Sequence, residues 1–556
     1  MAVTSTSATS LALKFQRDGG VCTGVRLPWF PILIAIGLLA FRLSGETPKA
    51  SSKHAEEDRQ AAALFAGPIL SFHVQLPPPS LDSLRNEPRK AVPASVTIGT
   101  QRFDNVTVHV KGAAGSTRSI DDNPALTLNF DKLVPGRRFS GLDKLHLNNS
   151  VQDSSLLSEQ LASHLYAELG VPTARATQVL VKLDDRDLGL YVLKEGYNRT
   201  FLRRNFPDPS GNLYDGGFVR DIDQDLERDS GDGPEDRKDL QKLRDASFTE
   251  KAELREKLLD AVLDTDRFIR VTAMQAILID WDGYGYNRNN YRLYHQPRTG
   301  RFTFIPHGMD QLLGGRRGGG MEIPMNGIVA ARFYESSMRR EQFFTEAERQ
   351  LTEVFTRPWL SNHFRVVRER LDPVVMRRPK WEQQFRMEAM VDFEERAYDR
   401  LRTAQDQMAS RPKPVRFNAD GATRVAHWQP RYQRGQARIE TTKIDGVEAL
   451  HLAAIARDTV SSFRATVRLP IGKYALTGRL KTRKLEAAKD ERYQGGAAIR
   501  ISGGDHQMRF SGDHDWTPFT HEFQVHDPRD VELVAELRAH SGEVWIDTGS
   551  ILLVRR

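Results

Sequence analysis

A change in hydrophobic periodicity near residue 411 is the feature that most constrains the fold of this 556-residue chain. Before it, residues 340–408 carry apolar side chains mainly at helical spacing, with proline breaks. After the proline-containing residues 411–414, short alternating runs are separated by Gly, Asp and Pro. Many short strands at such spacing are typical of an antiparallel sandwich. The sequence therefore predicts a mixed domain, a linker at 409–420 and an all-β domain at 421–556.

The part before the linker is predicted to mix strands and helices. Four leucines spaced every fourth residue from Leu157 predict a helix that Asp153 caps and Gly170 stops. Residues 220–250 are strongly charged and contain glycines, so we expect a mobile insertion there. Alternating apolar residues predict strands at 70–74, 106–110, 125–130, 178–183 and 188–193.

A polar turn, a short hairpin and an acidic turn follow one another at residues 278–315. The run 290–295 alternates as a strand, 297–300 supplies turn residues, and 302–305 alternates back. Antiparallel arms return the chain to its starting end, so the turn with Asp282 and Asn290 is predicted to lie near the turn with His307 and Asp310. An acid, an amide and a second acid are therefore expected to converge.

This order of residues matches the one that protein kinases use for a catalytic base and two metal ligands. Asp282 and Asn287 also have the spacing of the kinase catalytic loop. The alternative for Asp282 is a turn residue that caps the hairpin. A third reading, hydrolysis at a metal held by His307 and Asp310, falls short of the usual three protein ligands.

Two glycine-containing loops carry basic residues. Lys111 and Arg118 flank a run of small residues whose backbone amides can approach an anion. A tight surface loop explains the same glycines. Arg316 and Arg317 lie among glycines in a second loop, which is either able to close over an anionic ligand or a disordered crossing.

The N-terminal 44 residues have the pattern of an export signal or membrane anchor. Basic residues precede an apolar run at 27–41, which spans roughly 22 Å as a helix against the roughly 30 Å of a bilayer core. This predicts either a single anchor with the bulk of the chain outside the cytoplasm, or secretion after cleavage. Residues 45–67 are expected to be a linker. Cys22 is the only cysteine, so a disulfide scaffold is excluded.

The charge balance does not indicate nucleic acid as a partner. The net charge is +7 and the pI about 9.3, yet the basic residues are dispersed. Anionic substrates such as phosphates suit the same balance.

Residues 68–400 resemble the CotH family of spore-coat-protein-H-like atypical kinases. The resemblance is carried by motifs that occur in the family's order: Lys111 and Gly112, 145–149 with Asp153, 170–172, 189–191 with Glu195, 211–214, Trp281 and Asp282, Asn290 and Tyr291, and Pro306 with Asp310.

The resemblance implies a kinase-like domain at 68–408, ATP with Mg²⁺ or Mn²⁺, and phosphorylation of secreted or surface proteins. It also implies roles for individual residues. Asp282 is similar to the catalytic acid, Asn290 and Asp310 to the metal ligands, with Asn287 held in reserve, and Glu195 to the acid that follows the strand joining the lobes.

The chain departs from the family pattern in two places. Only the second of two acids is present at 306–310, and the strand at 124–130 has no lysine for the nucleotide phosphates. Lys111, Arg118 or Arg316 are the candidates to replace it. The C-terminal part resembles jelly-roll modules, including carbohydrate-binding ones. Trp516, Phe519 and Trp545 either stack on sugar rings or belong to the core.

The sequence thus predicts an α+β, two-lobed kinase-like domain followed by an all-β jelly-roll sandwich. The function expected from the resemblance is transfer of the ATP γ-phosphoryl to Ser or Thr of surface or secreted proteins. The alternative is a catalytically weak or inactive surface scaffold that binds protein or carbohydrate partners.

Overall fold

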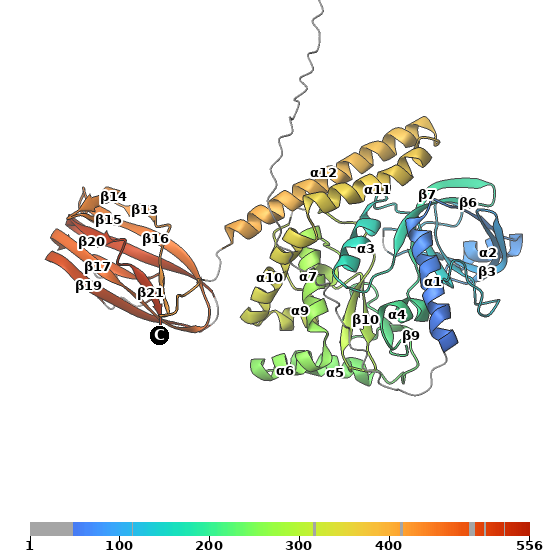
Figure 1. The fold of residues 1–556 in the computed structure, drawn as a ribbon, viewed down its shortest axis with the longest axis horizontal. Coiled ribbons are helices and arrows are strands. Elements are labelled where there is room, and N and C mark those ends of the chain that lie inside the picture. Colours follow the sequence, from blue (N-terminus) through green and yellow to red (C-terminus); the bar gives the residue numbers. More distant parts are fainter. Residues whose placement is uncertain are drawn as a thin grey trace, which may run out of the picture. The chain divides into compact units, whose positions relative to one another are not determined.

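The computed structural model describes residues 48–113, 115–314, 319–411, 415–488, 495–504, 508–526 and 529–556. It combines a mixed α and β part with an all-β sandwich, so the predicted fold class is confirmed (Figure 1).

Seven strands close into a barrel in the order β1-β2-β3-β4-β5-β7-β6. All neighbours pair antiparallel except β1 and β6, which are parallel. Alternate residues of each strand, such as Val106, Val108 and Val110, fill the interior. The strands are β1 (Ser71–Gln75), β2 (Val92–Ile98), β3 (Gln101–Lys111), β4 (Ala125–Asn129), β5 (Lys144–Asn148), β6 (Ala176–Leu183) and β7 (Arg186–Glu195).

Helix α3 (Ser158–Glu168) packs against the outside of the barrel. Its leucines meet Leu190 and Val192, which point outward from β7. The helix begins later than predicted, with Leu157 and not Asp153 at the N-cap position, but the Asp153 carboxylate still accepts the backbone N–H of Ser158 at 3.0 Å.

The second part of the mixed domain is mainly helical and encloses a four-stranded sheet in the order β11-β10-β8-β9. The predicted hairpin is confirmed, because β10 pairs antiparallel with β11 from Tyr291 opposite Pro306 to His295 opposite Phe302. The strands are β8 (Leu213–Asp215), β9 (Glu227–Ser230), β10 (Tyr291–His295) and β11 (Phe302–Pro306). The helices are α4 (Arg199–Asn205), α5 (Lys238–Phe248), α6 (Ala252–Val262), α7 (Thr265–Leu278), α8 (Tyr284–Asn287), α9 (Ile328–Phe333), α10 (Ser337–Glu353), α11 (Arg357–Val375) and α12 (Lys380–Ser410).

The charged residues 220–250 are not the insertion that the sequence predicts. They contain β9, which pairs with β8, and α5, which buries Leu240 and Leu243. Long-range ion pairs balance their charges; for example, the Arg292 Nε lies 2.8 Å from an Asp229 carboxylate oxygen.

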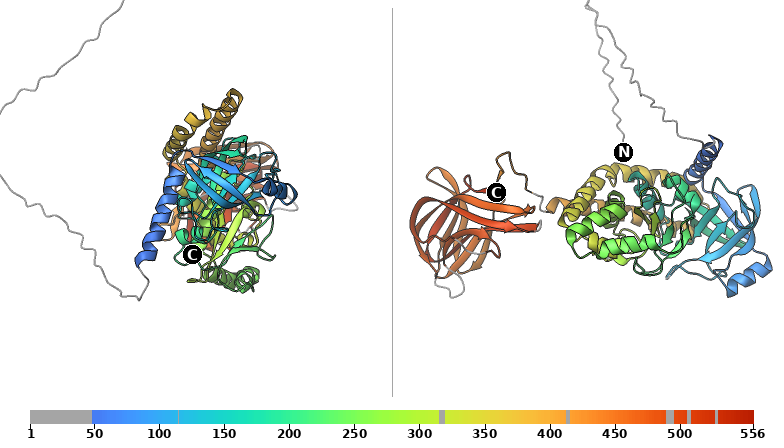
Figure 2. Two further views of the ribbon diagram at one scale, coloured as in Figure 1. Left: turned by 90° about the vertical axis from the view of Figure 1, so that its right-hand side faces the viewer. Right: turned by 90° about the horizontal axis from the view of Figure 1, so that it is seen from below.

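Residues expected to form a linker include helix α1 (Pro48–Ala66), whose residues 54–66 lie along the outside of the barrel (Figure 2). Ala61, Leu64 and Phe65 are buried in the same core cluster as the barrel interior. A second short helix, α2 (Pro78–Asn86), covers β2.

The described residues of the C-terminal part form an antiparallel sandwich of ten strands. The long strand β20 joins its layers: the N-terminal half pairs with β16 and β18, and the C-terminal half pairs with β15 and β17. The strands are β12 (Ala422–Arg424), β13 (Gln429–Arg434), β14 (Ala437–Ile444), β15 (Val447–Ala454), β16 (Thr459–Leu469), β17 (Gly472–Ala487), β18 (Gly496–Ile501), β19 (Gly512–Val525), β20 (Arg529–Asp547) and β21 (Leu552–Arg555).

The predicted membrane anchor needs a correction. Within the described residues, no helix combines the length and the hydrophobicity that crossing a bilayer requires. The apolar run at 27–41 itself lies outside the described residues. We therefore withdraw the prediction of a signal anchor. The predicted membrane partner and the predicted location outside the cytoplasm are withdrawn with it.

Candidate active site

The turn after α7 presents Asp282 as an acceptor for three side-chain amides. Asn287 donates to Oδ1 at 2.9 Å, while Asn289 and Asn290 donate to Oδ2 at 3.1 and 3.0 Å. The chain turns sharply before Asp282 because Ile279 adopts a left-handed conformation with φ of 48°. Three side chains that are close in sequence thus fix the orientation of one carboxylate.

The hairpin brings the second acidic turn to Asn290, as the sequence predicts. The His307 N–H donates to the Asn290 carbonyl at 3.1 Å, and Asn290 Nδ2 donates to the Gly308 carbonyl at 2.9 Å. A Cβ at Gly308 would lie 2.5 Å from Asn290 Oδ1, and φ there is +61°, so this position requires glycine. Among the described residues, Asn290 Oδ1 accepts no hydrogen bond.

Asp282, Asn290, Asp310 and Lys111 line one cavity of about 860 Å³. The barrel forms a wall of it with the outward side chains of four strands, whose inward neighbours fill the barrel core. These outward residues are His109 and Lys111 on β3, Thr127 on β4, Lys144, His146 and Asn148 on β5, and Lys194 on β7.

A buried ion pair between Lys194 and Glu159 is the main feature that the sequence analysis missed. Lys194 Nζ lies 2.7 Å from Glu159 Oε1, and the side chains are only 5% and 2% exposed. Lys194 is the second-last residue of β7 and lies on the same face as Leu190 and Val192, which pack against α3, the helix that carries Glu159. The sequence predicts both the strand and the helix that carry this pair. It did not show that Lys194 and Glu159 face each other across the contact between them.

Electrostatics in the cavity favour binding a charged ligand. Burial and then the Lys194 ammonium lower the pKa of Lys111 to about 7. Burial and then the Glu159 carboxylate raise the pKa of Asp310 to about 7. A bound anion would restore the charge of Lys111, and a bound cation would restore that of Asp310.

The residues at the hairpin fit a divalent metal ion. Asp310 is half-buried, and the backbone N–H of Asp310 itself donates a hydrogen bond to its carboxylate. Together with Asn290 Oδ1 it offers hard oxygen ligands, and Mg²⁺ commonly takes one or two carboxylates plus substrate phosphates. Among the described residues, no group of three or more His, Cys, Asp and Glu side chains is arranged to hold a metal ion without a substrate.

His307 and Asn287 have supporting positions. Burial lowers the pKa of His307 well below its usual range, so the imidazole is neutral. Its Nε2 has no hydrogen-bond partner among the described residues. Asn287 contributes through its bond to Asp282 and does not line the cavity.

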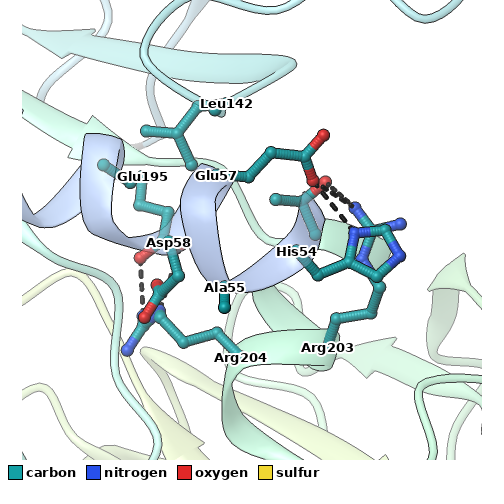
Figure 3. A pocket seen from close by; sticks show the side chains of 11 residues that line it. His54, Ala55, Glu57, Asp58, Leu142, Glu195, Arg203 and Arg204 are labelled. Atoms are coloured by element: carbon teal, nitrogen blue, oxygen red, sulfur yellow. Dashed lines mark hydrogen bonds and ion pairs between the residues drawn. The ribbon is translucent and has the colours of Figure 1, made fainter. Parts of the chain in front are cut away.

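Two predicted residues lie away from the cavity. Arg118 bonds to the carbonyls of Gly115 and Thr117 in its own loop. Glu195 points to the opposite side of β7 from Lys194 and faces a pocket beneath α1, where Arg204 binds its carboxylate at 2.6 Å (Figure 3). Arg316, the third substitute for the missing lysine, lies outside the described residues.

Two features of this cavity are typical of the kinase class. One is the lysine–glutamate pair on the sheet that forms its wall, and the other is the group of Asp282, Asn290 and Asp310 at the turn and hairpin. The chain belongs to the CotH family, because the family model described as CotH kinase protein matches residues 108–411. The inner spore coat protein H of Bacillus subtilis (strain 168) is 25% identical over 269 residues, which are 44% of this chain and 72% of that protein.

Two solved structures show partial similarity. The HipA–HipB complex of Shewanella oneidensis MR-1 with operator DNA aligns at 12% identity with a TM-score of 0.25, covering 54% of this chain and 67% of that chain. TmCBM61 in complex with β-1,4-galactotriose aligns at 12% identity with a TM-score of 0.18, covering 24% of this chain and 91% of that chain. At these TM-scores neither similarity carries a functional argument.

Proposed function

We propose that this CotH-family protein transfers the γ-phosphoryl group of ATP to a serine or threonine hydroxyl of a protein. The observation that carries the proposal is the position of Asp282, which three amides orient in the same cavity as Asp310 and the Lys194–Glu159 pair. Kinase-class enzymes act mainly by positioning and electrostatic stabilisation, and these groups supply both.

In this reaction Asp282 orients the acceptor hydroxyl and takes its proton. The hydroxyl oxygen bonds to the γ-phosphorus, the bond to the β,γ-bridging oxygen breaks, and ADP leaves. Lys111 and Lys194 approach the cavity from the barrel and offset the negative charge of the phosphates. A Mg²⁺ or Mn²⁺ ion, held by Asn290 and Asp310 when bound, would neutralise phosphate charge and orient the triphosphate.

Carbohydrate binding by the sandwich stays a prediction. Two of the three aromatic residues considered for it are buried: Phe519 belongs to the core cluster, and Trp545, 5% exposed, stacks on His451. Trp516 is half-buried, with the Arg479 guanidinium 5.3 Å from its ring centre.

Two measurements on the full chain test the proposal. The first is phosphoryl transfer from radiolabelled ATP to the protein itself and to general protein acceptors, with Mn²⁺ or Mg²⁺ and with chelator. Asp282→Asn should lower the rate by about a hundredfold or more, because a general base is lost. Asp185→Asn, at an exposed turn that does not line the cavity, is the matched control and should stay within twofold of wild type.

The second measurement is a thermal-shift titration with ATP plus metal. A ligand that binds only the native state stabilises it by about 2.7 kcal/mol at a hundred times its dissociation constant. The shift should survive in Asp282→Asn and disappear in Asp310→Asn, since only the second removes a metal ligand. Absence of both transfer and a metal-dependent shift, in a sample that melts cooperatively, would favour the alternative of a non-catalytic binding scaffold.

A further inference from the structure

Three arginines surround one buried glutamate on the outer face of the sandwich. Leu533, Ala535 and Leu537 of β20 point into the sandwich core, so Glu536 between them points outward. Arg500 of the neighbouring strand β18 lies on this outer face too, because Ile499 and Ile501 point inward.

The arginines bind the carboxylate of Glu536 from several directions. Arg500 Nη2 donates to Oε2 at 2.8 Å, and Arg509 Nη2 donates to Oε1 at 2.7 Å. Arg538 Nε lies 3.3 Å from Oε2. The Glu536 side chain is fully buried, and those of Arg500 and Arg509 are each 8% exposed.

Within the described residues, the pair Arg500 and Arg509 carries more positive charge than its acidic partner compensates. These two guanidinium groups share one carboxylate, which leaves one positive charge in a region largely removed from water. The next acid on the same face, Glu532, forms ion pairs with Arg464 and, at 3.6 Å, Arg431. Glu532 therefore does not neutralise the arginines around Glu536.

The cluster also has unused hydrogen-bond donors. Arg500 Nε, Arg509 Nε and Arg509 Nη1 are buried, and none has a hydrogen-bond partner among the described residues. Buried charges and donors without partners are costly, so a site of this kind is stabilised by an anion with several acceptor oxygens.

We propose that this outer face of β18 and β20 binds an oxyanion, namely a carboxylate, sulfate or phosphate group of a small ligand, through Arg500 and Arg509. Glu536 holds the guanidinium groups in place and is not itself a ligand. Burial acts to raise its pKa, but the Arg500 hydrogen bond and the three cations together lower the pKa of Glu536 to about 2, so it stays charged. The proposal is independent of phosphoryl transfer in the other domain.

Calorimetric titration of the full chain with sodium sulfate below 20 mM, at ionic strength held constant with sodium chloride, tests the proposal. We expect saturable binding in wild type and about tenfold or weaker binding in Arg509→Gln, because a charged hydrogen-bond donor is lost. Arg424→Gln, at an exposed position on β12 in the same sandwich, should bind like wild type. Sulfate also stabilises proteins without binding, but that effect does not saturate.

Glu536→Gln should change sulfate affinity in the opposite direction to Arg509→Gln. It keeps the proposal testable if Arg509→Gln does not fold. Removing the carboxylate raises the uncompensated charge, so sulfate should bind more tightly and raise the melting temperature more than in wild type. Binding of glucuronate but not glucose would identify a sugar acid as the source of the oxyanion, and binding of inorganic sulfate or phosphate alone would identify those ions. Absence of saturable binding of any of these anions in wild type, or equal binding in Arg509→Gln, would overturn the proposal.

Discussion

Replacing Lys194 with methionine should destabilise the protein strongly. The substitution keeps most of the aliphatic volume but leaves the Glu159 carboxylate without its cation, 2.7 Å away in the native protein. Glu159 Oε2 already has no hydrogen-bond partner among the described residues, so nothing compensates the loss. Removing one partner of a buried ion pair costs about 3–5 kcal/mol. This is a large fraction of the stability of an ordinary domain, which is about 5–15 kcal/mol.

Urea unfolding of three variants separates the ion pair from other effects. Lys182→Met, the same substitution on neighbouring strand β6 at a half-buried site, should cost much less than Lys194→Met. Adding Glu159→Gln to Lys194→Met should recover much of the lost free energy of unfolding, because the unpaired buried charge disappears. If the double variant is as unstable as Lys194→Met, or if the two lysine variants cost the same, the reasoning is refuted.

The double variant also separates folding from chemistry. If Lys194 offsets phosphate charge, the folded double variant should still transfer phosphate about a hundredfold or more slowly than wild type. Restored stability with restored transfer would instead make the pair purely structural.

Two further predictions concern α1 and a buried histidine. Gly141→Ala should loosen α1, because the new Cβ would lie 2.1 Å from the Glu57 carbonyl oxygen. We expect faster amide hydrogen exchange in residues 54–66. Gly136→Ala is the control and should leave α1 unchanged, because Gly136 has nearly the same positive φ but no atom within 4 Å of the added Cβ. Burial lowers the pKa of His363 to about 3, so below pH 6.5 the unfolded chain takes up a proton that the native state does not. The free energy of unfolding, measured by urea at pH 7 and pH 5, should therefore fall on acidification, by up to about 1.4 kcal/mol per pH unit more than in His363→Phe.

Local patterns carried most of the fold and the centre of the candidate site. The hairpin at 291–306 was predictable because period-two alternation and turn residues lie within sixteen positions, and Asp282, Asn290 and Asp310 follow from it. Helix α1 was not predictable, because among its residues 53–66, whose burial the structure describes, only Ala61, Leu64 and Phe65 are buried, within a polar sequence. The structure of residues 220–250 depends on ion pairs such as Arg292 with Asp229, whose partners are 63 positions apart. Such long-range pairing leaves no local signal.

The lysine absent from the strand at 124–130 illustrates the same limit of local patterns. On that strand, β4, the residues facing the cavity are the small Ala125 and Thr127. Their size leaves room for longer side chains from other strands of the same face, and Lys111 on β3 and Lys194 on β7 line the same cavity. The positive charge for the phosphates can therefore come from any strand on this outer face of the barrel and does not require a lysine on β4. Since the missing lysine was a reason to consider an inactive scaffold, two cations on the same face weaken that reason and make the transfer assay the deciding experiment.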